Sequence, residues 1–173
     1  MLHLDDAEIV QGDFRLRADM MFEQGQKYAV IGPSGSGKST LLGVLSGFVP
    51  LTKGRLTWQG RDITDLPPGA RPMTMLFQDN NLFPHLSVAQ NVGLGISPTM
   101  RLTQADREQI SHALGRVGLQ DHMEKRPGAL SGGQQSRAAL ARVLVQARPL
   151  VLLDEPFAAL GPALRNEMLD LVQ

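Results

Sequence analysis

The stretch Gly32-Pro33-Ser34-Gly35-Ser36-Gly37-Lys38-Ser39 decides the fold, because it fits the pattern G-x-x-x-x-G-K-[ST] of a phosphate-binding loop (P-loop). Glycines at these positions let backbone N–H groups converge on phosphate oxygens with no Cβ in the way. In this pattern the Lys38 ammonium reaches the β- and γ-phosphates, and the Ser39 hydroxyl ligates Mg²⁺. The stretch therefore predicts a site for a nucleoside triphosphate with Mg²⁺; a Gly/Ser surface turn is the alternative.

The residues on either side of this loop predict the elements that it needs. The apolar run at residues 27–31 predicts a buried strand that leads into the loop. Residues 39–47 predict a helix that Gly47 ends, and its positive end would point at the bound anion. Apolar and charged residues alternate over residues 14–20, which predicts a half-buried strand. Further strands are expected at residues 54–59 and 73–77.

The middle of the chain, from residue 88 to 146, is mostly helical in pattern. Thr103 followed by Asp106 predicts a capping box before an apolar stripe, and Ser131 predicts the N-cap of a second helix. Pro162 fits the first turn of a last helix that would end near Val172. Strands, then a helical block, then a strand and a helix together predict an α/β fold with a helical insert. The buried positions are expected at Ile110, Leu114, Val117, Leu140, Ala141 and Leu144.

Two carboxylates follow the apolar run at residues 150–153, which predicts a buried strand. Asp154 and Glu155 would then lie at the carboxyl edge of the sheet, where ligands bind in open α/β sheets. There Asp154 would hold Mg²⁺ through water, and Glu155 would act as the general base that polarises the attacking water. A solvated acidic turn is the alternative for the pair taken alone.

The segment Leu130-Ser131-Gly132-Gly133-Gln134, called the signature segment below, opens one of the predicted helices. A Ser-Gly-Gly start leaves backbone N–H groups exposed at the positive end of a helix, which predicts a second anion site. A plain N-cap turn is the alternative. In this order along the whole chain, the P-loop, the LSGGQ segment and the LLDEP segment resemble the ATPase subunits of the ABC family.

The resemblance implies an α/β P-loop NTPase fold with a RecA-like core and N-terminal antiparallel strands. Residues 1–173 would form a single ABC ATPase domain, with the core at 1–84 and 148–173 and a helical subdomain at about 85–147. ATP and Mg²⁺ are the implied cofactors, and Thr40 joins the P-loop residues that bind them. Gln78 matches the glutamine of the family that contacts Mg²⁺ and the attacking water.

The resemblance also implies partners. A second copy of the subunit would face the first head to tail, so that its signature segment covers the γ-phosphate of the bound ATP. Residues 72–94 are most similar to the ATPase subunits of bacterial thiamine importers, although importers for iron, sulfate or polyamines share much of this stretch. Integral membrane permease subunits would be direct partners, with a periplasmic solute-binding protein acting indirectly, at the cytoplasmic side of the inner membrane. The surface for the permease would comprise Phe77, Leu82, Phe83, Leu86 and Val88, for each of which core packing is the alternative.

The amino-acid composition excludes several kinds of partner and site. The chain has 173 residues, with 17 basic and 17 acidic side chains, so a nucleic-acid partner is not expected. It has no cysteine, which excludes disulfides and thiolate metal sites. The N-terminus lacks the pattern of a signal peptide, and no apolar run approaches the roughly 20 residues that span a bilayer.

The chain departs from the family pattern in several places. Ala158-Ala159-Leu160-Gly161 stands where S-A-L-D is usual, and Gln135-Ser136-Arg137 where R-Q-R is common. Residues 9–11 contain no aromatic to stack on adenine; Phe14 could substitute, whereas Tyr28 is expected in the core. No histidine follows Glu155, so the last core strands are expected to be missing. The alternatives are a piece of a longer ATPase or a degenerate nucleotide-binding module without turnover, and the 173-residue chain alone is expected to be a poor ATPase and a marginal fold.

Overall fold

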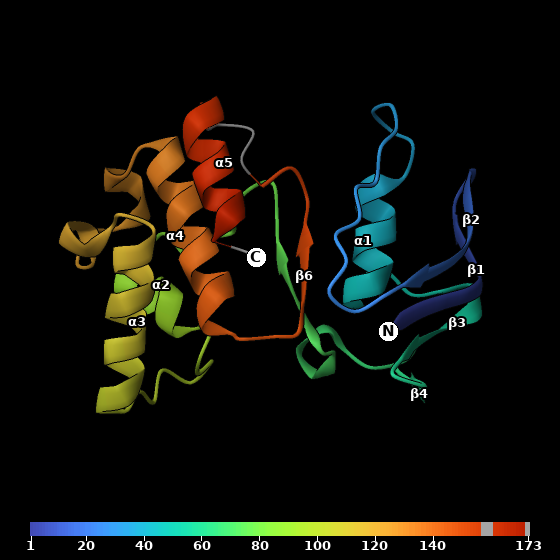
Figure 1. Ribbon diagram of the computed structural model, residues 1–173, viewed down its shortest axis with the longest axis horizontal. Coiled ribbons are helices and arrows are strands. Elements are labelled where there is room, and N and C mark those ends of the chain that lie inside the picture. The colour runs from blue at the N-terminus through green and yellow to red at the C-terminus, as the bar shows by residue number, and fades with distance from the viewer. Residues whose placement is uncertain (157–160, 172–173) are drawn as a thin grey trace. The chain divides into compact units, whose positions relative to one another are not determined.

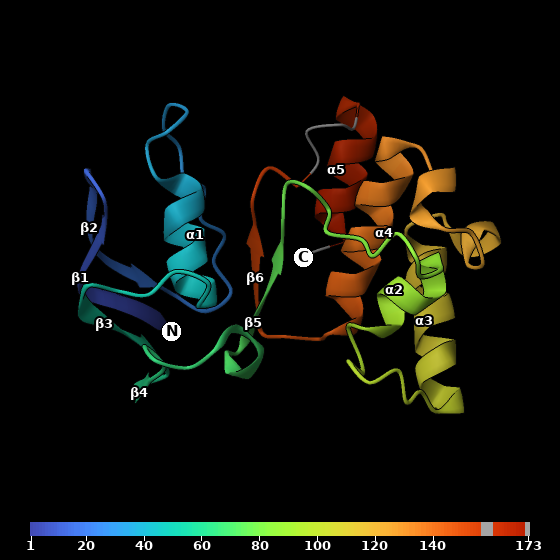
Figure 2. The ribbon, with the colours of Figure 1, turned by 180° about the vertical axis from the view of Figure 1, so that it is seen from behind.

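The computed structural model describes residues 1–156 and 161–171. They divide into two compact units, an N-terminal unit of residues 1–73 and a C-terminal unit of residues 74–173. Each unit has its own elements, which can be followed in Figure 1 and, from behind, in Figure 2.

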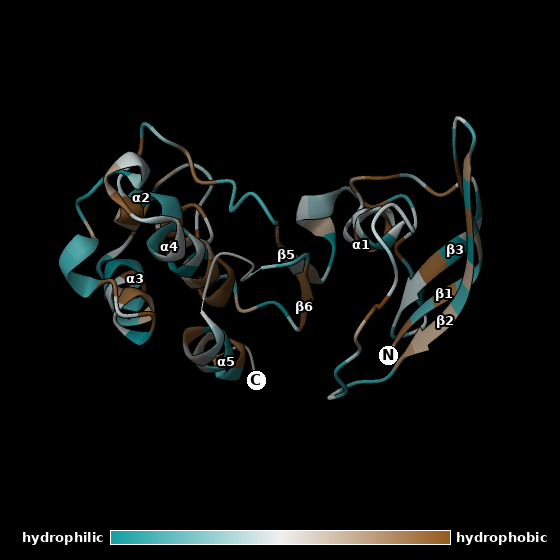
Figure 3. Cartoon of the chain, turned by 90° about the horizontal axis from the view of Figure 1, so that it is seen from above, coloured by the Kyte–Doolittle hydropathy of each residue, from teal (hydrophilic) through white to brown (hydrophobic). Residues whose placement is uncertain are grey.

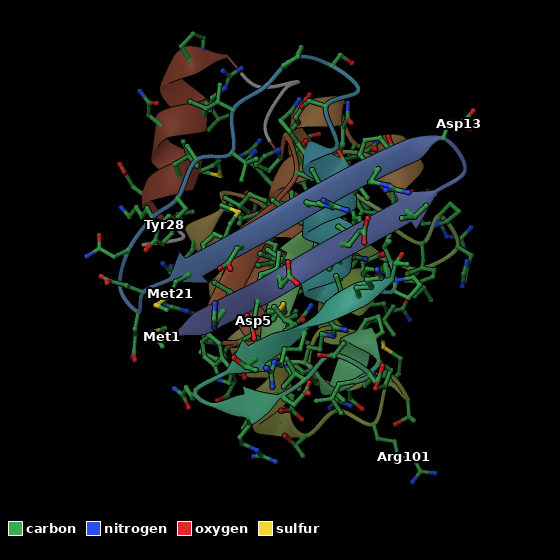
Figure 4. The ribbon with its side chains drawn as sticks, turned by 90° about the vertical axis from the view of Figure 1, so that its right-hand side faces the viewer. Met1, Asp5, Asp13, Met21, Tyr28 and Arg101 are labelled. Atoms are coloured by element: carbon green, nitrogen blue, oxygen red, sulfur yellow. The ribbon has the colours of Figure 1, made fainter. Side chains whose placement is uncertain are left out.

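The N-terminal unit is built on a four-stranded antiparallel sheet with the order β2-β1-β3-β4. Figure 4 shows this sheet face on, with Asp13 at the tight turn between β1 and β2 and with Met1 and Met21 at the other end of the hairpin. The strands expected at residues 14–20 and 54–59 and the helix expected at 39–47 are confirmed to within two residues. The elements are β1 (Leu2–Gln11), β2 (Phe14–Phe22), α1 (Lys38–Ser46), β3 (Lys53–Trp58), β4 (Arg61–Asp62) and the 3₁₀ turn η1 (Pro68–Ala70).

A bulge in β1 changes which side chains face the core, from the even-numbered positions before it to the odd-numbered positions after it. Leu4 and Ile9 are both fully buried, although an odd spacing would place them on opposite faces of a regular strand. The pairing register shifts between Leu4 and Ala7, and Asp6 adopts a φ of 41°. Gly54 of β3 lies opposite, where a Cβ would overlap the Asp6 carbonyl oxygen. Because the bulge breaks the period of two, alternation in the sequence did not indicate this strand.

The buried strand expected at residues 27–31 is wrong. These residues are in no strand and are all exposed, Ile31 to 91%. Tyr28, which was expected in the core, is 49% exposed; its ring meets Phe22 edge-on with centroids 5.1 Å apart, and its hydroxyl accepts the Glu23 N–H at 2.9 Å. An apolar run becomes a strand only where a neighbouring strand pairs with its backbone groups, and the four-stranded sheet ends at β2 and β4 without it.

Arg71 holds the carboxyl end of α1. Gly47 ends the helix with a φ of 88°, and a Cβ there would lie 2.6 Å from Nε of Arg71. The Arg71 side chain is buried, which lowers the pKa of its guanidinium. Its N–H groups satisfy carbonyl oxygens that the helix end and the following loop would otherwise leave without donors. These acceptors are Val44 at 2.6 Å, Leu45 at 2.7 Å, Thr64 at 2.7 Å and Leu66 at 2.8 Å.

Replacing Arg71 with methionine is therefore expected to lower the free energy of unfolding by at least about 3 kcal/mol, since each buried carbonyl left without a donor costs roughly 1–3 kcal/mol. Urea unfolding followed by circular dichroism measures the loss. Arg61→Met, in the exposed strand β4, is the matched control and should change stability by less than about 0.5 kcal/mol. A loss below about 1 kcal/mol for Arg71→Met would show that water replaces the guanidinium.

The C-terminal unit packs helices around α4, and its core contains Val92, Leu114 and Leu140, each fully buried. Figure 3 shows α2, α3 and α4 grouped together, and α4 contacts both of the other helices. The predicted capping box of Thr103 with Asp106 is confirmed at the start of α3. The elements are β5 (Met73–Leu76), α2 (Val88–Gly93), α3 (Gln104–Arg116), the 3₁₀ turns η2 (Gln120–His122) and η3 (Pro127–Ala129), α4 (Gly132–Val145), β6 (Leu150–Leu153) and α5 (Pro162–Asp170).

The start of α5 confirms the place expected for Pro162. Gly161 is the N-cap in extended conformation, with Pro162 in the first turn. The helix ends at Asp170, so the expected end near Val172 lies outside the described residues. Residues 158–160, which stand where the family has S-A-L, also lie outside them.

β5 and β6 form a two-stranded sheet. The Asp154 N–H donates to the Leu76 carbonyl at 3.0 Å, which joins the two carboxyl ends, so the strands run parallel, as Figures 1 and 2 show. The strands expected at residues 73–77 and 150–153 are confirmed. Only Leu152 of β6 is fully buried, and its neighbours are half-buried.

Candidate functional site

The P-loop of the N-terminal unit leads directly into α1, which begins at Lys38. Gly35 and Gly37 have φ values of 79° and 93°, which a residue with a Cβ rarely adopts. At Gly32 a Cβ would lie 2.7 Å from Oγ of Ser36. The loop is closed by a turn in which the Ser36 N–H donates to the Pro33 carbonyl at 3.2 Å. Gly37, which the pattern requires, is thus disfavoured for a side chain by its φ and by the Phe14 ring, whereas Gly35 is favoured by its φ alone, since a Cβ there would meet nothing within 4 Å.

Lys38 folds back over the loop that it follows. Its Nζ donates to the Gly32 and Pro33 carbonyls, both at 2.9 Å. An ammonium has three donors, so it can hold the loop through these carbonyls and still meet an anion. Gly37, the N-cap of α1, makes no side-chain cap, and the first turn of α1 has no acidic residue that would repel an anion. Ser34 and Ser39 are exposed, and Thr40 is half-buried.

Phe14 lies against the end of the loop. A Cβ at Gly37 would come within 2.6 Å of the Phe14 ring, whereas Tyr28 packs on Phe22. Of the two aromatic residues considered for adenine stacking, the structure therefore places Phe14 beside the P-loop.

In the C-terminal unit, the candidate catalytic residues follow the adjacent ends of β5 and β6. Gln78 comes two residues after β5 and is exposed. Asp154 comes directly after β6 and is half-buried, and the exposed Glu155 has a φ of 45°. A positive φ is unusual for glutamate, and such conformations cluster at functional sites. The structure therefore puts Gln78 after the strand end that is paired with the end of β6, where the sequence placed Asp154 and Glu155.

The signature segment begins α4 as predicted. Ser131 is the N-cap: its Oγ accepts the Gln134 N–H at 3.3 Å, and Oε1 of Gln134 accepts the Ser131 N–H at 2.9 Å. Nε2 of Gln134 also lies 3.0 Å from Nε2 of His122. Leu130 packs in the core, while Ser131 and Gly132 are exposed. The buried leucine and the bonded glutamine thus hold a Ser-Gly-Gly turn that faces solvent.

The apolar residues between Gln78 and α2 divide between surface and core. Val88 is fully buried, so the alternative given for it, core packing, is the one that holds. Phe83 is 46% exposed, and Leu82 is partly buried against the core. The side chains of Asn91 and Arg142 hold the backbone of this segment through hydrogen bonds. The sequence analysis missed both; the available signal was a polar side chain on the buried side of a helix, which needs a partner.

Each unit carries oxygen donors of the hard kind that Mg²⁺ prefers: the hydroxyl of Ser39 in the N-terminal unit, and the amide of Gln78 and the carboxylate of Asp154 in the C-terminal unit. The described residues contain no group of three or more His, Cys, Asp or Glu side chains placed to hold a metal ion, so a dedicated all-protein metal cage is not found among them. No helix in the described part of the chain is long and apolar enough to cross a membrane.

Comparisons with known proteins give a consistent result. The family model described as "ABC transporter" matches residues 17–158. The thiamine import ATP-binding protein ThiQ of Cereibacter sphaeroides is 62% identical over 172 residues, which cover 99% of this chain and 74% of that protein. The protein of the same name from Ruegeria sp. is 57% identical over 100% of this chain and 75% of its own length. A dimeric structure of a post-hydrolysis state of the ATP-binding cassette MJ0796, bound to ADP and Pi, matches with a TM-score of 0.88 and 27% identity over 99% of this chain and 81% of that one.

Proposed function

Since the chain belongs to the ABC transporter family, we propose that it is the ATP-binding subunit of a bacterial thiamine importer and hydrolyses ATP with Mg²⁺ to energise uptake. The observation that carries the proposal is the P-loop turn at the head of α1, with Lys38 folded over it. The assignment of thiamine as the solute rests on two relatives, 62% and 57% identical to this chain, whose names specify thiamine import.

In the N-terminal unit, the backbone N–H groups of the P-loop bind the phosphates of ATP, together with Thr40 in the first turn of α1. Without ATP, the Lys38 ammonium donates to loop carbonyls. When ATP binds, it also contacts the β- and γ-phosphates. Ser39 would supply its hydroxyl oxygen to Mg²⁺. When bound, Mg²⁺ would neutralise charge on the phosphate oxygens and so lower the barrier to the attack of water on the γ-phosphorus.

In the C-terminal unit, Glu155 takes the proton of the attacking water, because a carboxylate is a base strong enough for this step when it is held close to the water. Gln78 would orient the same water, and Asp154 would be the carboxylate that helps to hold Mg²⁺. The pairing of β5 with β6 supports these roles, since the three residues follow strand ends that a hydrogen bond from the Asp154 N–H to the Leu76 carbonyl joins.

The active form is a dimer of two copies. The signature segment of the second copy covers the γ-phosphate, through the exposed Ser131 and Gly132 at the positive end of α4. The similar ATP-binding cassette whose structure is described as dimeric and bound to ADP and Pi supports a dimer as the active form. The dimer is a peripheral protein that binds the permease subunits at the cytoplasmic face of the inner membrane. In each copy, about residues 85–147 form a helical subdomain. A periplasmic binding protein delivers the solute, and no nucleic acid takes part.

Transport in vesicles tests the proposal. The full-length protein is reconstituted with its permease, ATP is enclosed on the side of the ATPase, and radiolabelled thiamine is supplied with the binding protein. Uptake that requires hydrolysable ATP supports a thiamine importer. Uptake of iron, sulfate or polyamine instead would change the solute but keep the ATPase, whereas ATP binding without phosphate release would indicate a module without turnover.

A further inference from the structure

An arginine near the end of α4 holds the backbone that follows Gln78. Arg142 donates from Nη1 to the Asn81 carbonyl at 2.7 Å and from Nη2 to the Asn80 carbonyl at 2.9 Å. Both bonds bridge about 60 residues of sequence, and the side chain is largely removed from solvent, which lowers the pKa of its guanidinium. A planar fork that meets two successive carbonyls fixes both position and orientation, which a single donor does not.

The backbone that Arg142 holds is strained. Asn80 and Asn81 have φ values of 58° and 46°. The Asn80 N–H donates to the Phe77 carbonyl at 3.1 Å, which closes a turn with Gln78 and Asp79 at its centre. Residues with positive φ keep this conformation only where surrounding contacts hold them. Arg142 supplies such contacts at the end of the turn that carries Gln78.

The next part of the loop is held separately. Asn91 of α2 is fully buried, and its Oδ1 accepts the Phe83 N–H at 2.7 Å. Its Nδ2 donates to the carbonyls of Phe83 at 3.1 Å, Leu86 at 3.3 Å and Ser87 at 2.9 Å. Asn91 therefore fixes the backbone from Phe83 onward, and Arg142 fixes the backbone at residues 80–81.

The helix that bears Arg142 also bears the signature segment at its other end. α4 runs from Gly132 to Val145, and a helix of that length spans roughly 20 Å. Its first turn carries Ser131 and Gly132, and its last turn carries Arg142. One rigid element thus connects the exposed Ser-Gly-Gly turn to the turn of Gln78.

We propose that Arg142 is a positioning residue for ATP hydrolysis, which fixes the turn of Gln78 and ties it to the helix that begins with the signature segment. The proposal rests on the proposed function, in which Gln78 orients the attacking water. Arg142 acts on the orientation of that water and not on the capture of ATP, because its two guanidinium hydrogen bonds hold the turn of Gln78 and neither is to a P-loop residue.

The test compares Arg142→Met and Arg142→Lys in the full-length protein. Arg142→Met is expected to lower kcat at least tenfold while the dissociation constant for ATP stays within twofold. Arg142→Lys should keep an intermediate kcat, since an ammonium can replace one of the two bonds. Amide hydrogen exchange over residues 79–82 should be faster in Arg142→Met.

Arg137→Met is the matched control. Arg137 lies on the same helix and also donates to a loop carbonyl, that of Val117 at 2.9 Å, but its loop does not carry Gln78. Its kcat should stay within twofold and its exchange at residues 79–82 should not change. All assays are made below the onset of unfolding of the least stable variant.

The proposal is overturned if Arg142→Met retains its kcat, or if Arg137→Met loses as much. Unchanged hydrogen exchange at residues 79–82 in Arg142→Met overturns it as well. If the wild-type protein binds ATP but does not release phosphate, the proposed function fails, and the exchange measurement still decides whether Arg142 holds the turn.

Discussion

Lys38→Ala is expected to weaken ATP binding by at least about 100-fold, which corresponds to ~3 kcal/mol. The ammonium is the full positive charge that the P-loop brings to the β- and γ-phosphates, and a hydrogen bond to a charged group contributes roughly 1.5–3 kcal/mol. The loop N–H groups and the positive end of α1 remain in the variant, so residual binding is expected at high ATP concentration. Titration with a fluorescent ATP analogue measures the change.

Two controls distinguish the loss of the Lys38 charge at the phosphates from a loss of folded protein. Lys53→Ala removes an exposed lysine from β3 of the same unit, whose nearest acidic partner is Glu8 at 3.8 Å, and should bind ATP like the wild type. Lys38 also donates to the Gly32 and Pro33 carbonyls, and Lys38→Ala removes these two hydrogen bonds. A thermal melt of the variant without nucleotide checks that their loss does not unfold the protein. Equal ATP affinity in Lys38→Ala and the wild type would remove the P-loop from the binding site.

Glu155→Gln in the full-length protein is expected to bind ATP normally and to lower kcat by about 10²–10⁴-fold, the usual contribution of a general base. The amide keeps the shape of the side chain but cannot take a proton from the attacking water. Because ATP stays uncleaved, the variant should accumulate as an ATP-bound dimer. Size-exclusion chromatography with and without ATP, together with phosphate release, measures both effects.

Glu108→Gln is the matched control for this variant. Glu108 is an exposed carboxylate on α3 that accepts a bond from Gln104 at 3.1 Å, and its change should leave both turnover and elution unaltered. A Glu155→Gln protein that hydrolyses ATP at the normal rate, or stays monomeric with ATP at high protein concentration, would assign Glu155 another role.

The sequence by itself determined the features that depend on near neighbours in the chain. The P-loop glycines, the capping box at Thr103, the N-cap at Ser131 and Pro162 in the first turn of α5 all appear as expected. In each case the interacting atoms lie within a few residues of one another, so the residue types and their spacing specify the geometry. The strand ends that carry Gln78 and Asp154 also follow from short apolar runs.

Only the tertiary structure decided which residues are paired or buried across long separations. The apolar run at residues 27–31 has strand propensity, yet it is exposed because no neighbouring strand in the described sheets pairs with it. The bulge at Asp6 becomes explicable only with Gly54 opposite it. Arg71 and Arg142 look like ordinary charges in the sequence, but each binds carbonyls of distant segments. A buried donor is stabilised by whichever acceptors the fold brings to it, and one-dimensional spacing does not contain that information.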